Sequence, residues 1–203
     1  MKPYQWRTMA AGAFVALAVF LWTAPSSGQQ SGPPPFPVIG RTAPDFSLTD
    51  HQGRRIQLAQ FRGRLILLNF IYTNCADVCP ITTATLTRVQ RGLISRGWWA
   101  RDVVFLTVTT DPARDTTAAL ATFARRYQAD ARGWHFLTGD PFTLRTIYRA
   151  YGISVKPSGA AQEHDLPTFV IDRKGMVLGA YGLGFASDDV LRDLQQLRGT
   201  KGG

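Results

Sequence analysis

Residues 65–93 read LILLNFIYTNCADVCPITTATLTRVQRGL, and this stretch decides the fold of the chain. It begins with Leu65–Ile71, a short apolar run rich in branched residues, which predicts a fully buried strand. It ends with Leu86–Leu93, where apolar residues at helical spacing predict a helix. Between these two elements lie Cys75 and Cys79, the only two cysteines of the chain.

Pro80 directly follows the second cysteine. Proline is favoured at the first helical position, so the helix is predicted to begin there, with both thiols at or just before its N-terminus. A helix N-terminus favours negative charge, so we expect a lowered thiol pKa. Two thiols four residues apart on a helical turn share a face and can close a disulfide. When reduced, they can instead bind a soft metal ion, Cu(I) foremost and zinc next.

The length and composition fit a single domain of ordinary size with a basic surface. The chain has 203 residues and a net charge of +9, carried mostly by scattered arginines. The simplest interpretation is a solvated basic surface, and a more specific one is an acidic protein partner or an anionic membrane surface. We predict no nucleic-acid partner, because no aromatic and basic motif of the known binding folds is present.

The N-terminus has the layout of an export signal. Lys2 and Arg7 precede Met9–Ala24, sixteen residues without a charge. A membrane-spanning helix needs about 17–25 apolar residues, so residues 1–24 are interpreted as a signal peptide or an N-terminal membrane anchor, with a slight preference for the anchor. Positive charges before the run keep that end in the cytoplasm. We therefore expect the remainder at the inner membrane facing the periplasm or, after cleavage, in the periplasm.

A tether separates this segment from the folded domain. Residues 25–37 are rich in Pro, Gly, Ser and Gln, which is typical of a linker. The folded domain is predicted over residues 38–199. Its periodicity predicts a hairpin, two strand–helix units with the cysteines in the first, a third strand–helix unit, a second hairpin and a last helix. That order predicts an α/β fold with a mixed central sheet and helices on both faces. With a dithiol after the first central strand, the fold is thioredoxin-like, with an N-terminal hairpin.

The three histidines differ in their sequence setting. His51 lies in the early hairpin turn and is predicted at the surface, whereas His135 begins a strand and is predicted to be a satisfied, partly buried side chain. His164 ends a polar loop just before the strand 168–172, which in such a sheet neighbours the cysteine strand. Alone it would be interpreted as a solvated loop residue. Because two ligands seldom complete a metal site, the cysteine pair makes it the candidate third ligand.

Three segments now carry a family resemblance. Residues 73–80, TNCADVCP, resemble the T-x-C-x-x-x-C-P motif of the SCO/SenC family of thioredoxin-like copper proteins. Residues 111–116, DPARDT, are similar to that family's D-P-x-R-D-T segment, and residues 133–139 resemble its strand before the third helix. His164 occupies the place of the family's lone histidine ligand, before a strand ending I-D-x-x-G at residues 171–175.

The resemblance implies a function and a ligand set. Cys75, Cys79 and His164 would bind one copper ion, Cu(I) or Cu(II), and the cysteines could also act as a redox pair that forms a disulfide. The resemblance also implies delivery of copper to cytochrome c oxidase subunit II, or to another exported copper protein, or reduction of the cysteines at the oxidase copper site. Asp111 and Asp115 are not carried over as ligands and are interpreted as turn and helix-cap residues.

An alternative remains open from the same residues. Pro167 directly precedes the strand 168–172, where thioredoxins carry a cis-proline beside the dithiol, and the family pattern does not require it. An exported thiol–disulfide oxidoreductase would use Cys75 and Cys79 without metal, one thiolate attacking and the other resolving the mixed disulfide. The C-x-x-x-C spacing favours the copper protein, since dithiol oxidoreductases usually have two intervening residues. Pro167 could also be a trans-proline that begins a strand.

Overall fold

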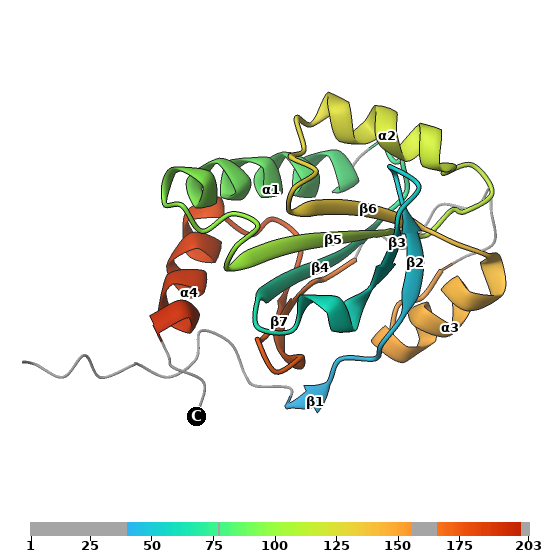
Figure 1. Ribbon diagram of the computed structural model, residues 1–203. Helices are drawn as coiled ribbons and strands as arrows, with labels where there is room; N and C mark the ends of the chain where they lie inside the picture. Colours follow the sequence, from blue (N-terminus) through green and yellow to red (C-terminus); the bar gives the residue numbers. More distant parts are fainter. Residues whose placement is uncertain (1–39, 77, 156–165, 200–203) are drawn as a thin grey trace, which may run out of the picture. The chain divides into compact units, whose positions relative to one another are not determined.

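The computed structural model describes residues 40–76, 78–155 and 166–199, which build one mixed sheet with helices packed against it (Figure 1). The predicted anchor, residues 1–24, and the predicted tether, residues 25–37, lie outside these ranges. The elements are β1 Arg41–Thr42, β2 Ser47–Asp50, β3 Arg55–Gln57, the 3₁₀ helix η1 Leu58–Phe61, β4 Leu65–Ile71, α1 Val78–Ser95, β5 Val103–Thr109, α2 Thr117–Arg126, β6 Trp134–Thr138, α3 Pro141–Tyr151, β7 Thr168–Ile171, β8 Met176–Tyr181 and α4 Ser187–Gly199.

The sheet has eight described strands in the order β1-β8-β7-β4-β5-β6-β2-β3. The central strands β4, β5 and β6 run parallel, and the remaining neighbours are antiparallel. Strand β7 pairs with β4, with Leu68 opposite Phe169. This confirms the prediction that the strand after the polar loop neighbours the cysteine strand. Within the described ranges, no helix has the length and apolar character that a membrane crossing requires.

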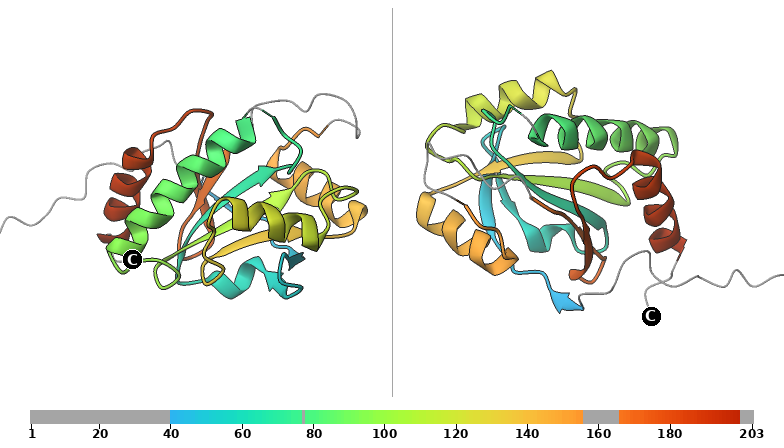
Figure 2. Two further views of the ribbon diagram at one scale, coloured as in Figure 1. Left: turned by 90° about the horizontal axis from the view of Figure 1, so that it is seen from above. Right: turned by 180° about the vertical axis from the view of Figure 1, so that it is seen from behind.

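Strand β4 explains why both faces of the sheet are covered. Its seven residues are all buried, and alternate side chains point to opposite faces. Ile66 and Leu68 join the apolar cluster under α3, whereas Leu65 and Leu67 join the cluster under α1, α2 and α4. Figure 1 shows α1 and α2 together in the upper part of the view and α3 at the lower right, and the view from behind in Figure 2 shows the same separation. Each fully buried Leu or Ile stabilises the fold by about 1.5–3 kcal/mol.

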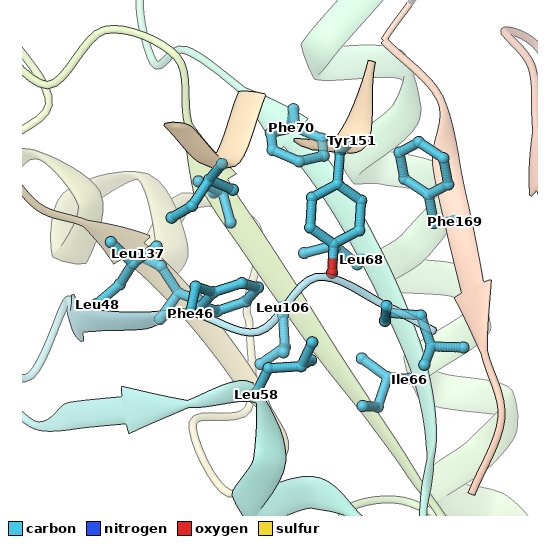
Figure 3. Close-up of a cluster of buried hydrophobic side chains, with 14 of the residues drawn as sticks. Phe46, Leu48, Leu58, Ile66, Leu68, Phe70, Leu106, Leu137, Tyr151 and Phe169 are labelled. Atoms are coloured by element: carbon cyan, nitrogen blue, oxygen red, sulfur yellow. The ribbon is translucent and has the colours of Figure 1, made fainter. Parts of the chain in front are cut away.

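Aromatic residues fix α3 against the end of β4 that leads to the cysteines. Figure 3 shows Tyr151 beside Phe70 and Phe169, and its ring centroid lies 5.9 Å from that of Phe70 and 5.4 Å from that of Phe169. The Tyr151 hydroxyl donates to the carbonyl of Pro44 at 2.9 Å. This hydrogen bond fastens the segment before β2 to the same core.

The ends of α3 match their sequence signals. Asp140 accepts hydrogen bonds from the backbone N–H groups of Phe142 and Thr143, and Gly152 ends the helix in the left-handed region at φ 71°. The two predicted hairpins are present as β2–β3 and β7–β8. Strand β1 and η1 were not predicted, because two and four residues are too few to show a periodicity.

Candidate metal centre

The cysteine loop leaves the carboxyl end of the central strand β4. Cys75 lies in the loop that follows β4, and Cys79 is the second residue of α1. Both side chains are buried, at 6% and 3% exposure, in the apolar cluster under α1. The backbone N–H of Cys79 donates to Cys75 Sγ at 3.3 Å. Both residues are present as thiols, so the structure places two sulfur atoms side by side in an environment shielded from water.

The helix begins two residues earlier than predicted. Val78 is its first residue, so Pro80 occupies the third position and Cys79 lies inside the first turn. The first four N–H groups of a helix have no intrahelical partner, so proline is tolerated throughout this turn. The prediction that the helix begins at Pro80 is therefore wrong, although both cysteines remain at its N-terminal end.

Burial reverses the expected acidity of the second thiol. Desolvation raises the pKa of Cys79 well above its ordinary value, and the hydrogen bond with Cys75 and the charge of Asp115 raise it further. The sequence had predicted a lowered pKa from the helix N-terminus. That expectation is wrong for Cys79, because a thiolate at 3% exposure loses more hydration than the helix end restores. The metal-free protein holds Cys79 as a neutral thiol at neutral pH.

A buried carboxylate holds the start of the cysteine loop. Asp115 is 1% exposed and accepts from both the backbone N–H of Thr73, at 3.1 Å, and the Thr73 hydroxyl, at 2.5 Å. It also accepts from the hydroxyl of Thr109 at the end of β5, at 2.5 Å. The helix α2 is capped instead by Thr116, which accepts from the N–H of Ala119. The prediction that Asp115 caps a helix is therefore wrong, and its role is to position the loop before Cys75.

Asp111 behaves as predicted. Its carbonyl accepts from the N–H of Arg114 at 3.1 Å, which closes a turn, and its carboxylate binds the Arg114 guanidinium at 2.6 Å. The Thr109 hydroxyl accepts from the backbone N–H of Asp111 while it donates to Asp115. A single hydroxyl thus links the turn to the carboxylate that holds the cysteine loop.

The third predicted ligand, His164, lies outside the described residues, and its place in the site stays a prediction. The described chain resumes at Leu166, and β7 begins with Thr168. Because β7 is antiparallel to β4, its first residue lies beside the carboxyl end of β4, where the cysteine loop begins. The Leu166–Pro167 bond is trans, as is every other peptide bond within the described ranges. Pro167 therefore matches the interpretation of a proline that begins a strand.

The other two histidines belong to a separate cluster with Asp50. His135 Nδ1 lies 3.2 Å from the Asp50 carboxylate, which confirms the prediction of a satisfied histidine, and the side chain is more buried than predicted. His51 is half-buried, and its Nδ1 accepts from the backbone N–H of Phe136 at 3.3 Å. The prediction of a surface residue is therefore wrong for His51. Both histidines are engaged with the β2–β3 hairpin and β6 and not with the cysteine loop.

The cysteine pair supplies the chemistry of this site. Two sulfur donors select soft ions such as Cu(I), and burial excludes competing water ligands. Among the residues that the structure describes, no third His, Cys, Asp or Glu completes a metal-binding group. Asp115 accepts hydrogen bonds from Thr73 and Thr109, so we assign it as a residue that positions the cysteine loop. Sequence patterns could not reveal this role, because it depends on the pairing of β4 with β5.

Comparison with known proteins agrees with this geometry. The family model SCO1/SenC matches residues 39–198, which include every described residue except Gly199, the last residue of α4. The chain belongs to the SCO1/SenC family. The match covers β4, the cysteine loop, α1 and β5 in one continuous segment, which confirms the family resemblance. Similarity to solved Sco structures confirms the thioredoxin-like fold.

Similar proteins were found among curated sequences and solved structures. The SCO1 protein homolog of Bacillus subtilis (strain 168) is 29% identical over 187 residues, which cover 87% of this chain and 91% of the relative. A putative copper-binding protein of Stutzerimonas stutzeri is 30% identical over 118 residues, covering 58% of this chain and 55% of the relative. BsSco, a member of the Sco family of cytochrome c oxidase assembly proteins with a disulfide switch, superposes with a TM-score of 0.70 at 26% identity, covering 81% of this chain and 97% of BsSco.

Proposed function

We propose that this SCO1/SenC protein is a membrane-tethered copper carrier that works in the assembly of cytochrome c oxidase. It binds one copper ion through Cys75, Cys79 and His164. It then transfers the ion to the copper site of subunit II, or to another exported copper protein, or reduces the cysteines of that site. Residues 1–24 hold it at the inner membrane, and residues 25–37 carry the domain into the periplasm.

The contact between Cys79 N–H and Cys75 Sγ is the observation that carries this proposal. It holds the two cysteines together, their thiols are hydrogen-bonded to each other, and both side chains are buried, which suits a soft ion. The named relatives support the same function, since one is a putative copper-binding protein and another belongs to a family of oxidase assembly proteins. A third ligand from the segment between Val155 and Leu166 would complete a three-coordinate site.

Copper binding by this pair must release protons. Burial raises the pKa of Cys79, so its thiol proton has to leave when the sulfur becomes a ligand. Copper affinity should therefore increase with pH over the neutral range. The buried, neutral thiol should also react slowly with disulfides and oxidants in solution, because the thiolate is the reactive species.

The alternative function, a metal-free thiol–disulfide oxidoreductase, is less well supported. Such an enzyme needs a thiolate that reaches the disulfide of another protein. Cys75 and Cys79 are 6% and 3% exposed, and burial keeps Cys79 protonated. The trans bond before Pro167 also lacks the cis geometry that motivated this alternative.

The test is a titration of the reduced full chain in detergent with Cu(II), followed by absorbance. The expected result is a thiolate-to-copper charge-transfer band that saturates at one equivalent and is lost in His164→Ala. His51→Ala is the matched control, because His51 belongs to the distant cluster, and it should keep the band. Wild-type affinity in His164→Ala would refute the ligand set. Oxidation of the dithiol by copper without a band would favour the oxidoreductase.

A further inference from the structure

The positive charge of the protein gathers at the end of the sheet opposite the cysteines. At this end β4 and β5 begin, β7 turns into β8, and α1 and α4 finish. We call the cationic side chains there the basic pole. They are Arg41, Arg62, Arg64, Arg96, Arg101, Arg173, Lys174 and Arg198.

Short contacts tie these segments into one surface. The N–H of Gly63 donates to the carbonyl of Arg173 at 2.9 Å, which joins the loop before β4 to the β7–β8 turn. Arg173 donates to the carbonyl of Leu197 at 3.2 Å, which joins that turn to the end of α4. The Arg198 guanidinium lies 4.3 Å from the ring centroid of Trp98, which joins α4 to the loop after α1. The basic pole is therefore a continuous patch.

The charge of the pole is barely compensated. The same segments contain two carboxylates, Asp102 and Asp172, which leaves a surplus of six positive charges. Asp102 is shared by Arg101 and Arg198, at 2.9 Å and 3.7 Å. Arg101 is 67% exposed, so much of its charge faces solvent.

The dithiol end has the opposite sign. In the described segments and first helical turns that follow β4, β5, β6 and β8, the one cation is Arg114, and the other charged residues are aspartates. These are Asp111, Asp115, Asp140, Asp188 and Asp189. The folded domain is thus an electric dipole along the strands, with its negative end at the cysteine loop.

The N-terminal part of the chain joins the domain at the basic pole. The N–H of Gly40, the first described residue, donates to the carbonyl of Val177 at 3.1 Å, and Arg41 pairs with Val177 at the start of β8. Figure 1 shows β1 in the lower part of the view, near the β7–β8 turn. Fifteen residues, 25–39, separate the uncharged N-terminal run from Gly40. Fifteen residues can span at most about 50 Å even when fully extended.

We infer that the basic pole docks on the anionic phospholipid surface in which the chain's own N-terminus is anchored. The short tether holds this pole near the bilayer, and electrostatic attraction acts within about one Debye length, roughly 8 Å at physiological ionic strength. Docking turns the cysteine loop away from the membrane, toward a partner domain that projects from it. This inference rests on the membrane tether of the proposed function, and it adds the orientation of the carrier.

The test uses the full chain in lipid nanodiscs that contain a headgroup-nitroxide lipid, with paramagnetic broadening of backbone amides measured by NMR. With anionic phosphatidylglycerol, the amides of Arg101 and Lys174 should broaden, and those of Phe142 and Leu183 at the dithiol end should not. Phosphatidylcholine alone should remove most of the broadening at the basic pole. Reduction of the nitroxide gives the reference spectrum.

A triple variant tests the charges directly. Arg41→Gln, Arg101→Gln and Lys174→Gln together should lower the ratio of docked to undocked protein about a hundredfold, from roughly fivefold per residue. The matched control, Arg125→Gln with Arg145→Gln and Arg149→Gln, removes the same charge from exposed positions on α2 and α3 and should keep the orientation.

Each outcome decides the inference. Equal broadening at both ends, equal loss in the control variant, broadening that ignores lipid charge, or failure of the chain to remain with the nanodiscs would overturn it. Copper titration of the same samples separates the two proposals. Copper binding without orientation would refute the docking alone, and orientation without copper binding would refute the carrier function alone.

Discussion

Asp50 and Asp115 are both buried carboxylates, but their hydrogen-bond partners differ in charge. Asp50 is fully buried and binds the Arg54 guanidinium at 2.7 Å and His135 at 3.2 Å. Asp115 is 1% exposed and binds only neutral groups among its described partners, the N–H and hydroxyl of Thr73 and the hydroxyl of Thr109. One carboxylate is paired with a cation, and the other is held by neutral hydrogen-bond donors alone.

The difference separates a structural cluster from the one at the candidate metal centre. The Asp50 cluster fixes the β2–β3 hairpin against β6 and lies apart from the cysteines. The Asp115 cluster lies at the cysteine loop, where an uncompensated negative charge favours a protonated Cys79 in the metal-free protein. The same charge favours a bound cation when copper replaces the proton. We therefore expect substitutions at Asp50 to change stability alone, and substitutions at Asp115 to change copper affinity as well.

Asp50→Ala should have the largest effect on stability. It removes the acceptor for the Arg54 guanidinium and for the backbone N–H groups of Gln52 and Arg54, and leaves buried His135 without its carboxylate. The free energy of unfolding should fall by about 3 kcal/mol, measured by urea denaturation. Copper affinity of the folded fraction should equal that of the wild type. A loss of affinity with retained stability would reverse the contrast.

Asp115→Asn should lower copper affinity about tenfold, because it removes a negative charge beside the site while it keeps the shape of the side chain. The free energy of unfolding should fall by about 1–2 kcal/mol, since an amide cannot accept all the hydrogen bonds from Thr73 and Thr109. Competition with a Cu(I) chelator measures the affinity. Unchanged copper binding would show that Asp115 does no more than stabilise the fold.

Acidification should weaken the Asp50 cluster first. Burial lowers the pKa of His135 below its ordinary 6.5, so the unfolded chain takes up a proton that the folded protein resists. Stability is then lost as the pH falls below 6.5, with a slope of up to about 1.4 kcal/mol per pH unit for one proton. Burial alone would raise the pKa of Asp50, but hydrogen bonds from Arg54 and His135 outweigh it and lower that pKa below 3.8. Its contribution is lost only as the pH falls below 3.8.

Urea denaturation between pH 4.5 and 7.5 measures the histidine part of this dependence. His135→Gln should reduce the slope below pH 6.5 relative to the wild type. His51 contributes with the same sign, because burial also lowers its pKa, so part of the slope should remain. A wild-type slope in His135→Gln would mean that other groups control the acid sensitivity.

Thr116→Ala should have the smallest effect and serves as the neighbour control for Asp115. It removes the cap of α2, which accepts the N–H of Ala119 at 3.2 Å. The free energy of unfolding should fall by about 1 kcal/mol, measured by urea denaturation. Copper affinity should stay at the wild-type value, because Thr116 makes no described contact with the cysteine loop. A drop similar to that of Asp115→Asn would assign the effect to α2 and not to the charge.

Local patterns were sufficient for most of the fold. Apolar runs gave β4 and β5, helical spacing gave the helices, and Asp140 and Gly152 marked both ends of α3. The thioredoxin-like architecture followed from the order of these elements and from the position of the dithiol. Strand β1 escaped prediction because its two residues are defined only by pairing with β8.

The site was less accessible to sequence reasoning. The cysteine pair is local and was found, but the acidity of Cys79 depends on its burial, which several distant elements create. The role of Asp115 depends on β4 and β5 lying parallel, with Ile71 beside Thr109, which brings Thr73 within reach of the carboxylate. No pattern around Asp115 itself distinguishes that role from helix capping.

The central claim is that Cys75, Cys79 and His164 together bind one copper ion. X-ray absorption of the copper-loaded full chain tests it most directly, because the scattering distinguishes sulfur from imidazole nitrogen. The account predicts two sulfur ligands and one imidazole in the wild type, with the imidazole signal lost in His164→Ala and kept in His51→Ala. A wild-type copper centre without imidazole, or an imidazole signal that survives His164→Ala, would contradict it.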